Sequence, residues 1–542
     1  MAQAAKQNRA SLGEKIKRFS RTVAFNNPLY SAMLNGEVPS HLAQTPRDSW
    51  PGDIAIAQSM LRGQFPIGGK DYPVIVQQGG FSIWETIMPQ SARAELHGFR
   101  WLRHLHAMGG NSGRQFARQL IEDWISRYNQ WDEFIWSAPI IAERLTAWLS
   151  QYAFFGISAD DHFRAHFFQC LMRQLRHLLR IYDECKNHHE YLQSLKGLLY
   201  AAYALGDEYL DMDAVVTEIQ NFCHDHIMAD GCFDGRAPHL QAEILQHLIE
   251  IRGIFTHGNR AIPDGMNETI AAMARAMRTM RHGDGGLALF HGSDKNDADF
   301  LDLLLVTANV KGRGADILDD GGWYRLNSGR SLIIVDGGRQ NDGYDGWHNA
   351  PLAFEFSSGR ERIIVNCGSG QSISPEWMTA AKLTAAHSTI DIENYSPDPN
   401  YNVVCERKSG DGLWFSGRHD GFAACGIEHQ RRIFMNSDGD DIRGEDILTR
   451  NSDSVFAPIP FSIRFHLHPK IQSIEAQNSV ILRTPSGAGW RLRASGCHMH
   501  LAPSVFLGQK GTIQRAKQII CQGELIGTDA HVKWAFQKEG KK

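Results

Sequence analysis

Apolar residues recur at intervals of three and four from about residue 92 to residue 310, which is the period of one buried face of an α-helix. The first regular stretch, 92–108, places Leu96, Leu102 and Leu105 on one side. The same period predicts further helices at 113–128, 139–154, 161–183, 190–206, 212–227, 240–255, 265–280 and 297–309. Helices of similar length with short connections indicate antiparallel hairpins that wrap into a bundle or toroid.

The pattern changes in the stretch 312–322, which is rich in glycine and aspartate. Beyond it, short apolar runs alternate with turn residues and predict strands at 323–326, 331–335, 352–356, 362–365, 389–392, 413–416, 427–434, 461–466 and 480–483. Such runs without intervening helices are typical of an antiparallel sandwich or barrel. The sequence therefore predicts a multidomain chain, α first and β second.

The predicted domains are an N-terminal extension that begins the helical domain (1–90), the helical domain proper (91–312) and the β domain (320–542). A chain of 542 residues is long for one core, which also favours two or more domains. The composition is that of a globular protein, 42% hydrophobic and 21% charged, with a net charge of -4. This balance argues against a nucleic-acid partner, so an acidic partner would need local positive charge.

The first 22 residues carry several Lys and Arg but no continuous apolar region, so we expect no secretory signal. We also expect no transmembrane segment, because no apolar run approaches the required length. The nine cysteines form no CxxC pair and are odd in number, as expected of free thiols in a reducing compartment. These features predict a cytoplasmic location.

Asn187 and His188 stand where the helix predicted at 190–206 begins. Asn187 followed three residues later by Glu190 fits a capping box, in which the Asn side chain accepts a bond from a free backbone N–H of the first turn. The alternative interpretation is chemical. An amide and an imidazole fixed at a helix mouth can serve proton transfer on an acidic sugar, with His189 and Tyr191 beside them.

A second motif leads from Asp234 into the helix predicted at 240–255, and Pro238 suits a first-turn position. Arg236 in the preceding loop is able to hold a carboxylate by two parallel N–H bonds, although an arginine on a surface loop is the commoner case. His239 in the first turn either faces the site or contacts solvent and loop carbonyls.

A third motif spans residues 344–368, where 357–360 reads as a hairpin turn between two strands. Folding about that turn brings the region around His348 close to Asn366. His387 joins them if residues 386–389 form part of a neighbouring strand. Trp347 either stacks on a sugar ring or is buried in packing.

Together these motifs resemble the heparinase II/III-like polysaccharide lyases, which are related to alginate lyases of the same architecture. The resemblance runs from Phe99-Arg100-Trp101-Leu102 through Asn187-His188 to the hairpin at 352–368 and to 386–389. It implies an N-terminal incomplete (α/α) toroid followed by a C-terminal antiparallel β-sandwich. This order agrees with the one that the periodicity predicts.

The resemblance implies a carbon–oxygen lyase that cleaves a uronic-acid-containing polysaccharide by β-elimination and requires no cofactor. Asn187 would neutralise the C6 carboxylate, and His188 would act as the base or orient the substrate. Arg236 and His239 complete the implied catalytic set. The implied substrate-binding residues are His189, Tyr191, Gln241 and Trp347.

The chain departs from the family pattern at three positions. The family's Tyr matches Leu240, the His that commonly follows it matches Gln241, and a further His matches Gly346. Proton delivery would then come from His239, His189 or Tyr191. Adjacent helical residues point about 100° apart, so replacement by a neighbour is not automatic.

The family's structural zinc is held by His, Asp and His, which match His348, Asn366 and His387. The amide of Asn366 removes the charged ligand that Zn²⁺ favours. Either Asp342 or Asp345 compensates, or the two histidines are ordinary hydrogen-bonded residues.

Two alternatives to the lyase stay open. One is a non-catalytic polysaccharide-binding or envelope-assembly protein, favoured by the missing Tyr. The other is a glycoside hydrolase, which needs two carboxylic residues at suitable separation. The residues near enough in sequence to supply them are Asp183, Glu190, Asp234 and Glu243. Family substrates lie in the periplasm or outside the cell, so a periplasmic location is the alternative to a cytoplasmic one.

Overall fold

The computed structural model describes residues 12–77, 80–185, 187–294, 297–340, 344–450 and 457–540. The chain divides into two compact units, neither of which is one continuous stretch. The first unit comprises Met1–His226 and Gln246–Asn267. The second unit comprises Ile227–Leu245 and Glu268–Lys542.

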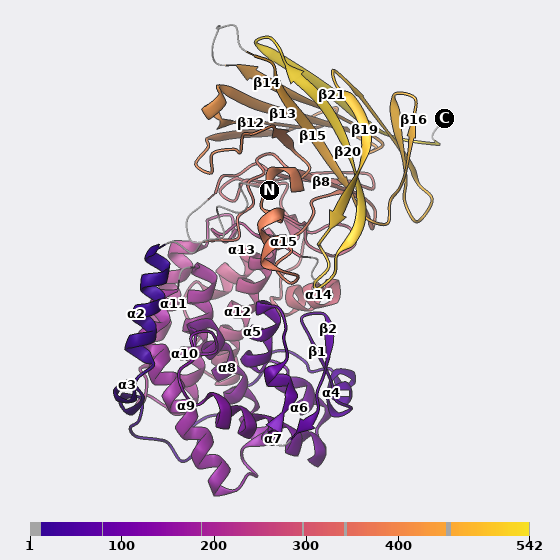
Figure 1. Ribbon diagram of the computed structural model, residues 1–542. Coiled ribbons are helices and arrows are strands. Elements are labelled where there is room, and N and C mark those ends of the chain that lie inside the picture. Colours follow the sequence, from indigo (N-terminus) through magenta and orange to yellow (C-terminus); the bar gives the residue numbers. More distant parts are fainter. Residues whose placement is uncertain are drawn as a thin grey trace. The chain divides into compact units, whose positions relative to one another are not determined.

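The first unit is built mainly of helices (Figure 1). These are α2 (Leu12–Phe25), α3 (Pro28–Met33), α4 (Ile54–Leu61), α5 (Gln90–Gly98), α6 (Leu102–Met108), α7 (Gly110–Tyr128), α8 (Ala138–Phe155), α9 (Asp161–Ile181), α10 (His188–Leu205), α11 (Met212–His226) and the second half of α12 (Pro238–His257). Two short hairpins lie before α5, namely β1 (Gln64–Ile67) with β2 (Lys70–Pro73) and β3 (Val76–Gln77) with β4 (Gly80–Phe81).

α8 and α10 form the centre of the first unit, because both are apolar over most of their circumference and both are buried along most of their length. Their neighbour α9 begins at a regular cap, in which the side chain of Asp160 accepts a bond from the backbone N–H of Phe163 at 2.8 Å. The helix starts and ends predicted for this region therefore fall within a few residues of the observed ones.

The prediction of a single helix at 92–108 is wrong, because this stretch forms two helices, α5 and α6. Phe99 stands between them with φ 62°, a left-handed conformation that ends α5. Its fully buried ring packs against Trp101 with ring centroids 4.9 Å apart, and the indole N–H of Trp101 donates to the carbonyl of Leu96 at 2.9 Å. Packing of the two rings compensates for a backbone conformation that a non-glycine residue rarely adopts.

The second unit contains the first half of α12, most of α13 (Met266–Thr279), α14 (Ala298–Thr307), α15 (Pro375–Ala381) and the strands that follow. The strands are β5 (Ile317–Leu318), β6 (Trp323–Ser328), β7 (Ser331–Asp336), β8 (Phe354–Ser358), β9 (Glu361–Val365), β10 (Ile390–Ile392), β11 (Val403–Ser409), β12 (Gly412–Phe422), β13 (Ile427–Asn436), β14 (Asp441–Arg450), β15 (Ile459–Leu467), β16 (Gln472–Ala476), β17 (Ser479–Arg483), β18 (Gly489–Ser495), β19 (His498–Phe506), β20 (Gln514–Leu525) and β21 (Asp529–Lys538). The change from helix to strand falls between Thr307 and Ile317.

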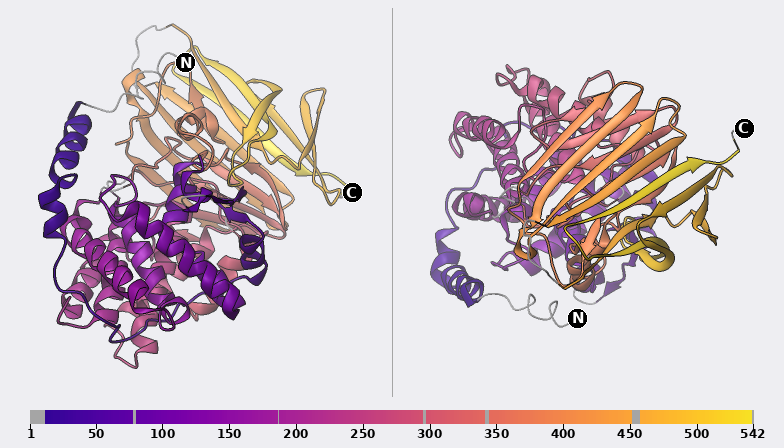
Figure 2. Two further views of the ribbon diagram at one scale, coloured as in Figure 1. Left: turned by 60° about the horizontal axis from the view of Figure 1, so that its bottom comes forward. Right: turned by 90° about the horizontal axis from the view of Figure 1, so that it is seen from above.

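The strands form two large antiparallel sheets. One has the order β19-β20-β15-β9-β8-β7-β6-β5, with β10 also paired to β15, and the other has the order β11-β12-β13-β14-β21-β18-β17-β16. Figure 2 shows the strands of the second sheet side by side in its right-hand view. The predicted turn at 357–360 is confirmed, because β8 and β9 pair from Ser358 to Glu361 around Gly359, whose φ is 61°.

One apolar core lies between these sheets. It joins Phe356 of the first sheet to Trp490 of the second, with ring centroids 5.0 Å apart, and Phe354 stacks on Trp534 at 5.5 Å. Along β13, buried and partly exposed residues alternate, as expected of a strand with one face in a sandwich core. The predicted order of a helical region followed by an antiparallel β-sandwich is confirmed.

All nine cysteines are free, as expected. Among the helices that the structure describes, none has both the length and the apolar composition that a membrane crossing needs.

Candidate functional site

The mouth of α10 in the first unit carries Asn187, His188, His189 and Tyr191, and all four side chains are partly exposed. Asn187 is the N-cap residue with extended backbone, and its carbonyl accepts the first helical bond, from Tyr191 N at 3.2 Å. The predicted helix start is therefore confirmed. The predicted capping box is wrong, because within the described chain the Asn187 side chain makes no capping bond to the first turn.

His188 packs against His226 at the end of α11, with ring centroids 3.8 Å apart. One turn further along α10, the phenol of Tyr191 donates to the carboxylate of Glu218 at 2.9 Å. Burial first, and then this carboxylate, raise the pKa of Tyr191 above its ordinary value. Tyr191 therefore stays protonated and holds α10 against α11, while the imidazole of His188 stands at the helix mouth.

Arg236 precedes α12 in the second unit and is 2% exposed, with φ 51°. Its Nε donates to the carbonyl of Gly321 at 2.6 Å, one terminal nitrogen donates to the carbonyl of Arg339 at 3.0 Å, and the other pairs with Asp336. Burial raises the pKa of Asp336, but the charges and hydrogen bonds of Arg236 and His291 together outweigh it and hold the pKa at about 2. These contacts give Arg236 protein partners, which differs from the predicted clamp on a substrate carboxylate.

A cavity of about 390 Å³ adjoins Arg236 in the second unit and is lined by Met228, Ala229, Arg236, Asp320 and Arg339. Because the side chain of Arg236 is almost wholly buried and that of Arg339 is exposed, Arg339 is the cation that this cavity offers to solvent.

Leu240 and Gln241 follow on α12 and are 2% and 1% exposed. The Gln241 side chain accepts from Phe233 N at 2.8 Å and donates to the carbonyls of Gly231 and Met273 at 2.7 and 3.1 Å. Gln241 therefore ties the preceding loop and α13 to α12. This corrects its prediction as a substrate-binding residue, because both ends of the amide contact the backbone.

His239 is the partly exposed residue of the first turn of α12, which begins at Pro238 as predicted. Its Nδ1 lies 3.0 Å from the hydroxyl of Ser293, and its Nε2 lies 3.5 Å from the phenol of Tyr344. The same phenol donates to the carbonyl of His291 at 3.2 Å. Burial, followed by the carboxylate of Glu243, raises the pKa of Tyr344, so the phenol keeps its proton beside the imidazole.

Trp347 is 8% exposed and stacks on His291, with ring centroids 3.7 Å apart and planes 11° apart. The guanidinium of Arg236 lies 5.1 Å from the Trp347 ring. His291 in turn places Nε2 at 2.7 Å from Asp336. Of the two interpretations of Trp347, buried packing is the one that this geometry supports, and a sugar-stacking role is not.

The structure brings His348, His387 and Asn366 together, as the hairpin predicted. The two imidazole centroids are 5.0 Å apart, and the Asn366 Oδ1 accepts from the backbone N–H of Ser388, the residue after His387, at 3.0 Å. The other end of the amide donates to Glu355 at 3.3 Å. Both imidazoles are almost fully buried, and burial first, then neighbouring histidines, lower the pKa of His348.

These donors do not fit a structural zinc. Such sites use four donors drawn from Cys, His and carboxylate, and here the third position is a neutral amide that is already hydrogen-bonded at both ends. Within the described residues, no Cys, Asp or Glu completes a group of three around His348 and His387 with ligand atoms within 4.8 Å of one another. Of the two proposed substitutes, Asp345 is exposed and Asp342 lies outside the described residues.

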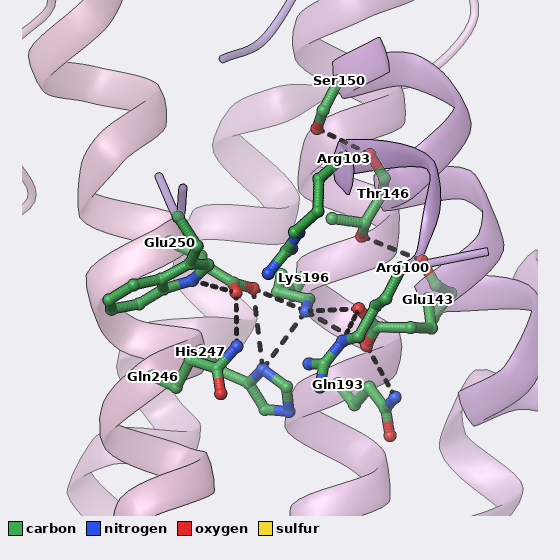
Figure 3. Close-up of polar contacts among 12 residues, drawn as sticks. Arg100, Arg103, Glu143, Thr146, Ser150, Gln193, Lys196, Gln246, His247 and Glu250 are labelled. Atoms are coloured by element: carbon green, nitrogen blue, oxygen red, sulfur yellow. Dashed lines mark hydrogen bonds and ion pairs between the residues drawn. The ribbon is translucent and has the colours of Figure 1, made fainter. Parts of the chain in front are cut away.

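A buried ion network occupies the middle of the first unit (Figure 3). Lys196 on α10 is 0% exposed, and its Nζ lies 2.7 Å from Glu250 on α12, 3.3 Å from Glu143 on α8 and 3.2 Å from Nδ1 of His247. Arg100 bonds Glu143 at 2.5 Å from the more exposed side. Burial raises the pKa of Glu143, but Arg100 and Lys196 outweigh it and hold the pKa at about 2.

The sequence interpretation missed Tyr344, Ser293 and this network. A signal for the network was available, because Glu143 and Lys196 each interrupt an otherwise apolar helix face, where a buried charge needs a partner. No comparable signal pointed to Ser293 or Tyr344, which meet His239 only through the fold. The carboxylic residues considered for hydrolysis divide between the units, Asp183 and Glu190 in the first and Asp234 and Glu243 in the second.

Residues 310–535 match the family model described as heparinase II/III-like, C-terminal. A relative, FtsZ-localized protein C of Caulobacter vibrioides, is 27% identical over 92% of this chain and 91% of its own.

Two solved structures share the fold. A crystal structure of heparinase III superposes with a TM-score of 0.74 and 14% identity, covering 97% of this chain and 91% of that one. The heparan sulfate lyase HepC from Pedobacter heparinus gives 0.61 and 14%, covering 95% and 88%. At these identities the likeness shows the fold alone. The chain therefore has a region that matches the heparinase II/III-like C-terminal domain, and it shares the fold of heparinase III over nearly its whole length.

Proposed function

We propose that this chain is a carbon–oxygen lyase that cleaves a uronic-acid-containing polysaccharide by β-elimination. The observation that carries the proposal is the amide–imidazole pair Asn187 and His188 at the partly exposed mouth of α10. The family resemblance assigns elimination chemistry to this pair, and the helix start fixes the backbone of both residues where solvent reaches their side chains.

In the proposed reaction the amide of Asn187 donates to the C6 carboxylate and stabilises the charge that develops on it when C5 loses its proton. His188 takes that proton as the general base. The electron pair of the broken C5–H bond forms the C4–C5 double bond, the C4–O4 bond breaks, and O4 receives a proton. The sugar chain is cut without a cofactor.

For the proton on O4 we propose His239, in place of the phenol that Leu240 lacks. Ser293 at Nδ1 and Tyr344 at Nε2 fix the ring, so a proton added to the imidazole has a defined position. This assignment is tested separately from that of Asn187 and His188, because it concerns the second unit.

The test is to follow the ultraviolet absorbance of the conjugated double bond during incubation with a panel of acidic polysaccharides. Asn187→Ala and His188→Ala are expected to lower the rate by a factor of about 10² to 10⁴, and His239→Gln by a similar factor. His162→Gln is the matched control, because His162 is an exposed histidine on α9, and this variant is expected to keep the full rate.

New reducing ends without the double bond would contradict the lyase and favour hydrolysis by residues such as Asp183, Glu190, Asp234 or Glu243. A double bond that persists in His239→Gln but not in the Asn187 and His188 variants would remove His239 alone from the mechanism.

A second candidate function is a polysaccharide-binding or envelope-assembly protein without catalysis. It is favoured by the buried Leu240 where the family has its Tyr, and by the structural contacts of Arg236 and Gln241. The relative in Caulobacter vibrioides is named for localisation with FtsZ and not for an enzymatic activity. On this proposal the chain binds an acidic envelope polysaccharide and co-localises with FtsZ.

Affinity electrophoresis in gels containing each polysaccharide tests this second function, together with the position of a fluorescent fusion relative to FtsZ. Retardation without any cleavage product, and a fusion that follows FtsZ, would support it. Turnover in the absorbance assay would overturn it. Cell fractionation of the same fusion distinguishes the cytoplasmic from the periplasmic expectation.

A further inference from the structure

Asn366 stands at the end of β9, at the position of the family's zinc-binding carboxylate, and its side chain is fully buried. Oδ1 accepts from Ser388 N at 3.0 Å, and Nδ2 donates to Oε1 of Glu355 at 3.3 Å. The backbone N–H of Asn366 donates to the same carboxylate oxygen at 2.9 Å. The amide therefore has a fixed orientation, with its donor end toward Glu355.

Glu355 on β8 is fully buried and is the centre of these contacts. Its second oxygen lies 2.9 Å from Nε2 of His282, whose Nδ1 lies 2.8 Å from the hydroxyl of Ser357. Arg362 adds charge beside the carboxylate and bonds Asp284 in a two-armed contact, both distances being 3.0 Å. Hydrogen bonds and ion pairs thus run without interruption from Ser388 to the loop at 282–284.

A zinc ion would have to take a donor from this chain of contacts. Binding through Oδ1 of Asn366 competes with the Ser388 N–H for the same oxygen, and the oxygen carries no charge to offset that of the ion. Glu355 already accepts two bonds on one oxygen and one on the other. Among the described residues of this cluster, the Nδ1 atoms of His348 and His387 are the buried atoms without a hydrogen-bond partner, and two imidazoles make half of a usual zinc site.

We infer that the second unit is stabilised at this position without zinc, and that the chain Ser388–Asn366–Glu355–His282 replaces the metal as the link between β8, β9 and the segment that carries His387. The cause is the single amide at Asn366. The inference does not depend on the proposed enzymatic activity.

The first test uses the wild-type full chain purified without chelators. Metal analysis is expected to find zinc far below one ion per chain, and thermal unfolding is expected to give the same midpoint with zinc, with EDTA and with neither. Stoichiometric zinc, together with a lower midpoint in EDTA, would overturn the inference.

The second test is Asn366→Asp, which replaces the donor end of the amide by a carboxylate oxygen facing Oε1 of Glu355. Two buried carboxylates at hydrogen-bond distance repel one another, so the variant is expected to unfold at a lower temperature than wild type when metal is absent. It also restores a charged ligand beside two imidazoles. Zinc is therefore expected to bind this variant and to raise its midpoint, and wild type is expected to show no such response.

Asn366→Asp/His387→Gln is the matched control, because it keeps the new carboxylate and removes one imidazole. It is expected to lose the zinc response. If Asn366→Asp alone is too unstable to purify, Asn366→Asp/Glu355→Gln removes the repulsion and is expected to show the same gain of zinc binding. An Asn366→Asp variant that folds and ignores zinc would overturn the assignment of Asn366 as the cause.

Discussion

Each unit contains a buried cluster of ionisable groups, and the two clusters make these groups compatible with burial in different ways. In the first unit, Lys196 lies between Glu143 and Glu250, so full charges of opposite sign stabilise one another. In the second unit, His348 and His387 lie side by side, and the neutral amide of Asn366 donates to the carboxylate of Glu355. The first solution depends on ionisation and the second largely on neutrality.

The difference follows from the elements that supply the side chains. Helices α8, α10 and α12 supply Glu143, Lys196 and Glu250, so that one lysine reaches two glutamates. In the other cluster, Glu355 lies on β8 and Asn366 directly follows β9, so the carboxylate accepts its bond from the amide of the adjacent segment. Buried pairs of full charges stabilise little in themselves, but removal of one member leaves an uncompensated charge. The two regions should therefore respond very differently to single changes.

The largest expected effect is that of Lys196→Met, which keeps most of the length of the side chain and removes its charge. Glu143 and Glu250 would remain buried without the cation that lies between them. We expect the free energy of unfolding to fall by about 3–5 kcal/mol. Urea unfolding followed by circular dichroism measures it, and a loss below about 1 kcal/mol would show that the network is not held by charge.

A pH titration of stability gives the next largest effect and concerns the neutral histidines of the second unit. Burial first, then His387 and Arg464, lower the pKa of His466 from 6.5 to about 3. Between these pH values the unfolded chain binds a proton that the folded one does not, so stability is complete above pH 6.5 and falls as the pH drops toward 3. The expected slope is about 1.4 kcal/mol per pH unit.

The contribution of His466 is isolated by His466→Gln, measured by urea unfolding at a series of pH values. The variant should lose the slope that this one group contributes, even if it is less stable at neutral pH. Glu143 affects stability in the same direction but over a more acidic range, because its pKa is lowered to about 2 and its contribution to stability is lost only as the pH falls from 4.5 toward that value. Identical slopes in wild type and His466→Gln would show that this imidazole is already protonated in the fold.

The smallest effect is expected for Lys408→Met in β11. Its Nζ lies 2.7 Å from Glu406, the same distance as between Lys196 and Glu250, but the two side chains are 67% and 59% exposed. Water already solvates both charges, so the free energy of unfolding should change by less than about 1 kcal/mol. The same urea measurement applies, and an effect as large as that of Lys196→Met would show that distance and not burial decides the comparison.

Most helices of the first unit could be predicted from the sequence because their apolar residues recur at the helical period and their ends carry local signals. The helices predicted at 161–183 and 212–227 correspond to α9 and α11. The break at Phe99 carried no glycine or proline and depends on the packing of Trp101, which no local pattern reveals. Propensity is overruled there by tertiary contacts.

The strands were less predictable. β14 was missed because polar and apolar residues mix along it, and its partner β21 follows about eighty residues later. β21 itself alternates regularly through Val532, Trp534 and Phe536, so its signal was present and was overlooked. Strand pairing over such distances depends on contacts that a single window of sequence does not contain.

The candidate site was predictable in part. Asn187 and His188 were placed at a helix start, and His348, Asn366 and His387 were brought together by a hairpin that carried its own turn signal. The partners of Arg236 and His239 were not predictable, because Asp336 and Tyr344 are about a hundred residues away and in loops or strand ends. Such distant partners decide whether a polar residue is available to a substrate.

The division of the chain into units has a consequence for the order of events during synthesis. The first unit needs residues up to Asn267, so its helices can complete their packing while most of the chain has not yet left the ribosome. The segment Ile227–Leu245, which carries His239, is made before that point but belongs to the second unit. It must therefore wait for its partner Tyr344, and a nascent chain halted near residue 312 would expose it to chaperones or proteases.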